Sequence, residues 1–148
     1  MMSDAEYMAI ALGLARKAAE LGDVPVGAVV VKDGQIIAEG YNERVFCGSA
    51  TSHAEVLAIE RACAKLGSWR LSGCTLYVTL EPCPMCAGAI INSRIDRVVF
   101  GAKDAKAGCF GSLINFNSYP FNYKPTLTEG VCADDCARLL SEFFEKRR

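Results

Sequence analysis

Two short stretches, residues 53–55 and 81–86, constrain the fold of this chain more than any other feature. Cys83 and Cys86 stand at Cys-x-x-Cys spacing between a strand-like and a helix-like run, so both sulfurs can reach one metal ion. His53, the one histidine of the sequence, can supply a third ligand. One imidazole and two thiolates suit Zn²⁺, and three protein ligands leave a position open for water, as in catalytic zinc sites. The fold must therefore bring two distant segments to one point.

Glu55 lies two residues after His53, where its carboxyl group can handle the protons of a bound water. Residues 52–55 also match a capping box, in which Glu55 would only accept a hydrogen bond from the backbone N–H of Ser52. The nearby cysteines favour the catalytic interpretation. Two alternatives remain for the cysteines: a redox pair, or a structural zinc site closed by Cys47, Cys74 or Cys109 as the fourth ligand.

Composition and charge limit the kinds of protein that this chain can be. The 148 residues are 51% hydrophobic and 22% charged, which suits a single domain, residues 1–148, with a substantial core. A net charge of −1 excludes a broadly basic nucleic-acid binder but leaves room for a local basic patch. The N-terminus is acidic and lacks a signal-peptide core, and no apolar run is long enough to span a membrane. We therefore expect a cytoplasmic protein whose eight cysteines are reduced.

Hydrophobic periodicity predicts alternating helices and strands. A first helix is expected between a capping box at residues 3–6 and a stop at Gly22, and a final one over residues 133–146. Between them we expect strands over 24–31, 36–41, 75–80 and 97–100, helices over 53–66 and 84–92, a loop over 42–52 and an irregular region over 103–123. This order predicts an α/β fold with a sheet between helical layers and both motifs at helix N-termini.

His-x-Glu followed by Pro-Cys-x-x-Cys is the signature of zinc-dependent nucleobase deaminases. Beyond this signature, most of the chain resembles the TadA-type tRNA adenosine deaminases of the cytidine deaminase superfamily. The matching segments are 24–29, 40–42, 76–89, 93–95, 98–106 and 111–113, with the closing Phe143-Phe144. The resemblance implies a three-layer α/β/α, cytidine-deaminase-like fold with a mixed sheet of about five strands. It further implies one zinc ion per chain, a homodimer, and conversion of the wobble adenosine of a tRNA anticodon to inosine.

Roles follow from the resemblance residue by residue. His53, Cys83 and Cys86 resemble the zinc ligands, and Glu55 resembles the proton shuttle. For the substrate, Asn42 resembles the residue that hydrogen-bonds the flipped base, Val26 lies on the pocket wall, and Asp104 lies in the loop that meets neighbouring nucleotides. From the chemistry alone, we also expect the backbone at Ala54 and Cys83 to hold the flanking polar atoms of the base. Candidates for contacts to the RNA backbone are Arg44, Arg70, Arg94, Lys103, Lys106, Lys124, Arg147 and Arg148.

Three residues depart from the family pattern in ways that bear on the substrate: Cys109, Phe110 and Tyr123. Two alternative functions also stand beside tRNA deamination. One is deamination of a free base or nucleoside, such as guanine or cytosine, by the same zinc chemistry. The other is a zinc-stabilised binding subunit without catalysis, against which Glu55 argues because a structural zinc needs no proton shuttle.

Overall fold

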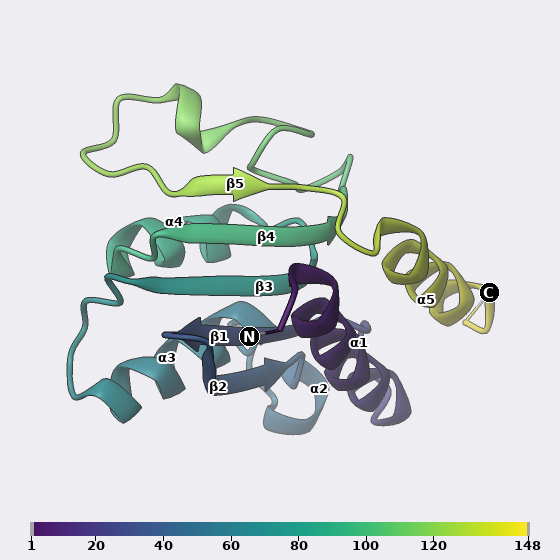
Figure 1. Ribbon diagram of the computed structural model, residues 1–148. Helices are drawn as coiled ribbons and strands as arrows, with labels where there is room; N and C mark the ends of the chain where they lie inside the picture. Colours follow the sequence, from purple (N-terminus) through teal and green to yellow (C-terminus); the bar gives the residue numbers. More distant parts are fainter. Residues whose placement is uncertain (1, 148) are drawn as a thin grey trace.

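The structure, a computed structural model, describes residues 2–147, and a sheet forms its middle layer (Figure 1). Within these residues the sheet has five strands in the order β2-β1-β3-β4-β5. They are β1 Gly27–Lys32, β2 Gln35–Tyr41, β3 Cys74–Leu80, β4 Arg97–Ala102 and β5 Thr126–Thr128. Strand β1 runs antiparallel to both of its neighbours, whereas β3, β4 and β5 are parallel. The predicted α/β class and the mixed five-stranded sheet are confirmed.

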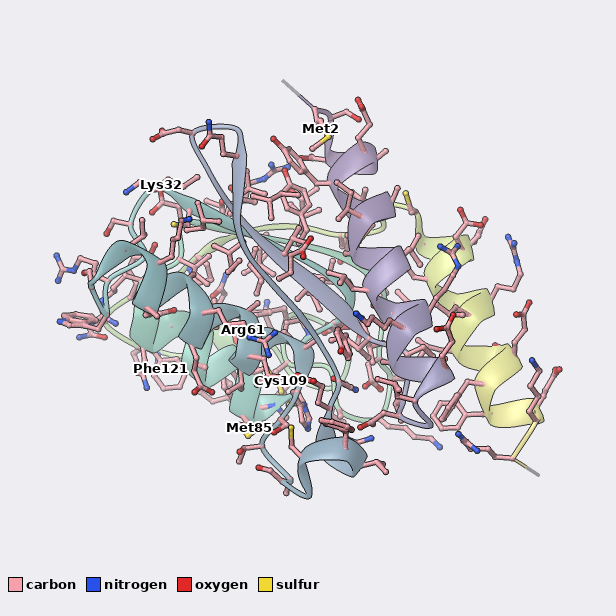
Figure 2. All side chains as sticks on the ribbon, turned by 90° about the horizontal axis from the view of Figure 1, so that it is seen from below. Met2, Lys32, Arg61, Met85, Cys109 and Phe121 are labelled. Atoms are coloured by element: carbon pink, nitrogen blue, oxygen red, sulfur yellow. The ribbon has the colours of Figure 1, made fainter. Side chains whose placement is uncertain are left out.

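Helices cover both faces of the sheet, and alternate side chains of the strands point to each. Helices α1 Asp4–Glu20 and α5 Ala133–Glu145 pack on the face that carries Val29 and Tyr77. Helices α3 Ala54–Leu66 and α4 Pro84–Ser93 pack on the face that carries Val30 and Leu76. Figure 2, viewed from the β2 edge, shows the two helical layers on either side of the sheet. The fold is therefore α/β/α in three layers, as expected.

Local sequence accounts for most of the boundaries. The Ser3 hydroxyl accepts from the N–H of Glu6, and the Glu6 carboxylate accepts from the N–H of Ser3, so the predicted capping box starts α1. The hairpin of β1 and β2 turns through Asp33 and Gly34, both of which have positive φ. That geometry is the two-residue turn whose twist matches the flanking strands. Pro84 opens α4 at a position where a missing N–H has no cost.

One strand start and two elements differ most from the sequence prediction, and β4 also continues to Ala102 instead of ending at residue 100. Strand β1 begins at Gly27 rather than at residue 24. The expected loop over 42–52 contains a short helix, α2 Arg44–Cys47, because the distant carboxylate of Asp23 accepts from the N–H of Val45. Strand β5 was not located from the sequence, because three residues show no periodicity and only pairing with β4 defines it.

The positions of the strand ends and of α3 create the site. Because β3 and β4 are parallel, both end at the same edge of the sheet, and α4 begins there directly after β3. Helix α3 reaches this edge by packing closely on β2. A Cβ on Gly40 would lie 2.5 Å from the carbonyl oxygen of Ala54, so only glycine permits this approach. No helix within residues 2–147 has the length and apolar character needed to cross a membrane.

Candidate active site

The imidazole of His53 and the thiols of Cys83 and Cys86 meet at the N-termini of two helices. His53 is the N-cap of α3, Cys83 is the N-cap of α4, and Cys86 lies in the first turn of α4. His53 Nδ1 lies 3.7 Å from Cys83 Sγ and 3.6 Å from Cys86 Sγ. Ligands of a tetrahedral zinc with the usual bond lengths lie roughly 3.5 Å apart. The spacing and chemistry of this donor set therefore fit a zinc ion.

The electrostatics of the two thiols also fit a cation. The pKa of Cys83 is lowered to about 4, first by a hydrogen bond from the Cys86 thiol and then by one from His53. The pKa of Cys86 is correspondingly raised by its hydrogen bond to Cys83 and by burial. Both sulfurs lie at the positive N-terminal end of α4, so a bound cation would stabilise both thiolates at once.

The alternative interpretations of the cysteines are not supported within residues 2–147. All eight cysteines are free thiols, and Cys83 and Cys86 lie with His53 in a metal-ligating cluster rather than as an isolated pair. The metal-ligating cluster has three members, and no fourth candidate joins it. Cys74 begins β3 at the far end of the strand, Cys47 is exposed, and the thiol of Cys109 donates to the carbonyl of Ala107.

Glu55 faces the same space as the ligands and is only 4% exposed. The capping interpretation is wrong, because His53 rather than Ser52 is the N-cap and α3 has no side-chain cap. The N–H of Ser52 instead donates to the carbonyl of Ser49. Burial raises the pKa of Glu55 to about 7, which is the range in which a carboxyl group exchanges protons readily at neutral pH.

A cavity of about 180 Å³ gathers most of the predicted site residues. Its lining includes Val26, Asn42, His53, Glu55, Cys83 and Asp104, while Cys86 is completely buried beside it. A larger open hollow of about 640 Å³ lies between α1, β2 and α3, where Arg61 is found (Figure 2). That hollow contains no metal-ligating cluster among the described residues, so the smaller cavity is the candidate site.

Asn42 and Ala54 are linked to each other at the cavity. Asn42 Oδ1 accepts from the N–H of Ala54 at 2.8 Å, and Asn42 is 5% exposed. With its oxygen bound, Asn42 has its amide NH₂ group to offer to a ligand. The N–H of Ala54 is used in this bond, and contact between the Ala54 backbone and a base stays a prediction.

Asp23 is a site residue that sequence reasoning missed. It is 2% exposed and accepts from the N–H groups of Val24 and Val45 and from the guanidinium of Arg44, at 2.8–3.2 Å. Val24 and Arg44 both line the cavity, so Asp23 fixes one wall of it. No local pattern marks Asp23, because its partners on α2 are far away in the sequence.

The basic residues proposed to meet RNA are spread over the surface. Arg44 lines the cavity, and Lys103 and Lys106 line an adjoining hollow. Arg94 caps the far end of α4 and stacks near the rings of Trp69 and Tyr123. Arg70 also lies over Trp69, Arg147 lies over Phe143, Lys124 is exposed, and Arg148 lies outside the described residues.

The residues that depart from the family pattern are structural in this fold. Cys109, labelled in Figure 2, and Phe110 are 0% and 2% exposed and belong to the core beneath α3 and α4. The Tyr123 hydroxyl donates to the carbonyl of Ile95 at 2.8 Å, beside the end of α4 opposite to Cys83. Tyr123 therefore lies at the end of α4 away from the metal-ligand candidates.

A three-layer α/β/α fold with an imidazole, two thiols and a buried carboxyl group around one cavity defines a deaminase of the nucleobase type. The MafB19-like deaminase family matches residues 2–148. The chain is 50% identical to the "tRNA-specific adenosine deaminase" of Bacillus subtilis over 149 aligned residues, which cover 100% of this chain and 92% of that protein.

Solved structures agree with this assignment. A structure from a study of A-to-I editing by tRNA:A34 deaminases superposes with a TM-score of 0.89 at 43% identity, covering 91% of this chain and 99% of the other. A guanine deaminase from Nitrosomonas europaea superposes with a TM-score of 0.81 at 28% identity, covering 97% and 85%. This chain belongs to the family of tRNA-specific adenosine deaminases.

Proposed function

We propose that this protein hydrolyses the exocyclic amine of the wobble adenosine, position 34, in a tRNA anticodon and leaves inosine. We further propose that residues 1–148 form a single deaminase domain, with one zinc ion per chain, in the cytoplasm. The observation that carries the reaction is the convergence of Glu55, His53, Cys83 and Cys86 on one cavity, with Asn42 on its wall. Full-length identity of 50% to a tRNA-specific adenosine deaminase supports the substrate.

The residues of the site divide the chemistry among them. His53, Cys83 and Cys86 would hold Zn²⁺, which lowers the pKa of water and so supplies a nucleophile near neutral pH. Glu55 takes a proton from the attacking water and delivers it to the ring nitrogen next to the carbon that bears the amine. Glu55 then takes the remaining proton from the added hydroxyl group and passes it to the amine, which leaves as ammonia while a carbonyl forms. Burial prepares Glu55 for both steps, because its pKa is raised to about 7.

Asn42 and Val26 would position the base. The Asn42 amide NH₂ can donate to an acceptor on the purine, because its oxygen is held by Ala54. Val26 is 4% exposed and offers an apolar wall against the ring. Asp104 lines the rim of the cavity, where its carboxylate can meet a neighbouring nucleotide.

The space beside the cavity favours an oligonucleotide over a free base. A hollow of about 470 Å³ adjoins the cavity and shares Val24, Leu80 and Asp104 with it. Its lining adds Lys103, Lys106 and the half-exposed ring of Phe144. Lysines beside an aromatic surface suit the phosphates and bases of a single strand. Deamination of free guanine is the second candidate function, because the chain is 28% identical to the guanine deaminase of Nitrosomonas europaea.

The deciding experiment incubates zinc-loaded protein with an anticodon stem-loop bearing adenosine at the wobble position and measures inosine by mass. A panel of free bases and nucleosides, including guanine and cytosine, runs in parallel. We expect inosine at that single position and none with Glu55→Gln, which keeps the zinc ligands and the side-chain volume. Loss of about 10²-fold or more is expected for this proton shuttle. Ammonia released only from a free base would move the protein to the free-base class.

A homodimer is the proposed assembly. Phe46 and Val45 on α2 are 75% and 66% exposed, and Met85, Leu113 and Ile114 are also exposed. Apolar side chains of this size are normally covered in interfaces. Sedimentation equilibrium should give twice the mass of 15.9 kDa, and Phe46→Asp should shift it towards the monomer. A wild-type chain that sediments as a monomer at micromolar concentration would refute the dimer.

A further inference from the structure

Glu81 is a buried carboxylate that the reaction described above does not use. It follows β3, two residues before Cys83, and is 2% exposed. Of the ion pairs formed within residues 2–147, none involves Glu81. A carboxylate without a cationic partner is costly to bury unless hydrogen bonds satisfy it. The hydrogen-bond donors around the Glu81 carboxylate therefore indicate the role of this residue.

All four donors come from one loop, residues 104–112. Glu81 Oε1 accepts from the N–H of Asp104 at 3.1 Å and from the hydroxyl of Ser112. Glu81 Oε2 accepts from the N–H of Phe110 at 3.0 Å and from the N–H of Ser112 at 3.1 Å. A carboxylate offers about four acceptor positions, so the loop fills all of them.

The loop has no regular secondary structure, although Cys109 and Phe110 pack in the core and the carbonyl of Asp104 accepts from the N–H of Gly108. It contains no helix or regular strand between Asp104 and Ser112, apart from an isolated bridge at Phe110. Gly108 passes directly over the carboxylate: a Cβ there would lie 2.4 Å from Glu81 Cδ. Close backbone contact and four hydrogen bonds together make Glu81 the centre around which the loop folds.

This arrangement connects two walls of the cavity. The loop supplies Asp104 and Ala107 to the lining, and the turn that bears Glu81 supplies Cys83. The N–H of Cys109 also donates to the carbonyl of Pro82, which ties the loop to the same turn. We propose that Glu81 is a positioning residue, which fixes the Asp104 loop against the Cys83 turn and so sets the gap that receives the nucleotides beside the target base.

The proposal rests on the proposed function for the identity of the substrate, and its test separates the two. Glu81→Gln keeps the size of the side chain, but its NH₂ group must face at least one buried N–H of the loop. We expect unchanged zinc content and circular dichroism, and amide hydrogen exchange of residues 104–112 faster by about tenfold. For the anticodon stem-loop, KM should rise about tenfold with kcat within about twofold, because the gap and not the reacting groups changes.

Matched variants complete the experiment. Glu60→Gln removes an exposed carboxylate from α3 and should leave loop exchange and KM unchanged. Gly108→Ala keeps the Glu81 side chain but adds a methyl group to the loop that would collide with it. This variant should displace the loop and raise KM as Glu81→Gln does. If Glu81→Gln loses zinc or does not fold, unchanged loop exchange in Gly108→Ala would still overturn the proposal, because the added methyl group would lie 2.4 Å from Glu81 Cδ and 2.5 Å from the carbonyl oxygen of Asp104.

Two outcomes separate the hypotheses. Unchanged loop exchange and KM in folded, zinc-loaded Glu81→Gln, or in Gly108→Ala, would overturn the positioning role. If the wild-type protein forms no inosine in the stem-loop, the proposed substrate fails, and the exchange of residues 104–112 in Glu81→Gln still tests whether Glu81 holds the loop.

Discussion

At the scale of single residues, the candidate site depends on which polar atoms form hydrogen bonds within the protein and which stay free to bind the substrate. Asn42 illustrates this division, because its oxygen supports the start of α3 through Ala54 while the residue also lines the cavity. Glu55 is held differently, because its carboxyl group hydrogen-bonds its own backbone N–H and the thiol of Cys86, one of the metal-ligand candidates. Its carboxyl group therefore lies beside the groups that would hold the metal ion.

Substitutions at Asn42 can separate the two duties. Asn42→Asp keeps an acceptor for the N–H of Ala54 but loses the NH₂ donor, so kcat/KM should fall by roughly 10- to 100-fold with stability little changed. Asn42→Ala loses both and should also destabilise the fold by about 1–2 kcal/mol, since a buried N–H is left unpaired. Urea unfolding and deamination kinetics on both variants check this. Equal activity of wild type and Asn42→Asp would show that the NH₂ group does not bind substrate.

At the scale of elements, a polar cluster joins the N-terminus of α1 to the sheet. The guanidinium of Arg97 on β4 donates twice to the Asp4 carboxylate, at 3.1 and 2.6 Å, and the Tyr77 hydroxyl on β3 donates to it at 2.7 Å. The hydrogen bond from Arg97 is the main cause that lowers the pKa of Asp4 below its ordinary value of 3.8. Helix α1 is thus attached to two strands by one carboxylate.

The cluster predicts a pH-dependent contribution to stability. A carboxyl group whose folded-state pKa is lowered stabilises the fold fully above its ordinary pKa and loses that contribution as pH falls through the folded-state value. Asp4→Asn should therefore cost about 1 kcal/mol near neutral pH, a value limited by solvent screening of this partly exposed pair. The difference should shrink at about pH 3 and below.

Urea unfolding of both proteins across this pH range provides the measurement. Asp135→Asn is the control, because Asp135 pairs with Arg138 on the exposed surface of α5 and should cost under about 0.5 kcal/mol. A wild-type advantage that stayed constant down to about pH 2 would mean that the charge of Asp4 does not contribute.

At the scale of the whole molecule, the metal ligands tie together two helices that the sheet alone places side by side. His53 opens α3 and Cys83 opens α4, so a metal ion bound there would bridge the two helices of one layer. A ligand that binds only the folded state stabilises it by about 4 kcal/mol at a thousandfold excess over Kd. Chelation should therefore lower the melting temperature by about 10 °C for a chain of this size.

Differential scanning calorimetry with and without a strong chelator tests this expectation. His53→Ala lacks one ligand, so its melting temperature should lie below that of the wild type and respond much less to the chelator. A wild-type melting temperature that is unchanged by complete removal of zinc, as verified by mass spectrometry, would show that the metal adds nothing to the fold.

The sequence by itself determined the structural features that depend on residues close together in the chain. The capping box at Ser3, the Asp33-Gly34 turn, Pro84 at the start of α4 and the Cys-x-x-Cys pair each act within a few residues, so local chemistry predicts them. Because such signals mark helix and strand ends, the α/β order and the three metal-ligand candidates could be predicted.

Only the tertiary structure decided the features that join distant segments. Asp23 holds α2, Glu81 holds the loop of Asp104, and β5 exists through pairing with β4. None of these has a local signal, since the partners of a buried carboxylate or an edge strand are chosen by packing and not by sequence neighbours. The sequence therefore determined which groups can perform the chemistry, and the fold decided which walls surround them, because buried polar groups must find their partners wherever the chain brings them.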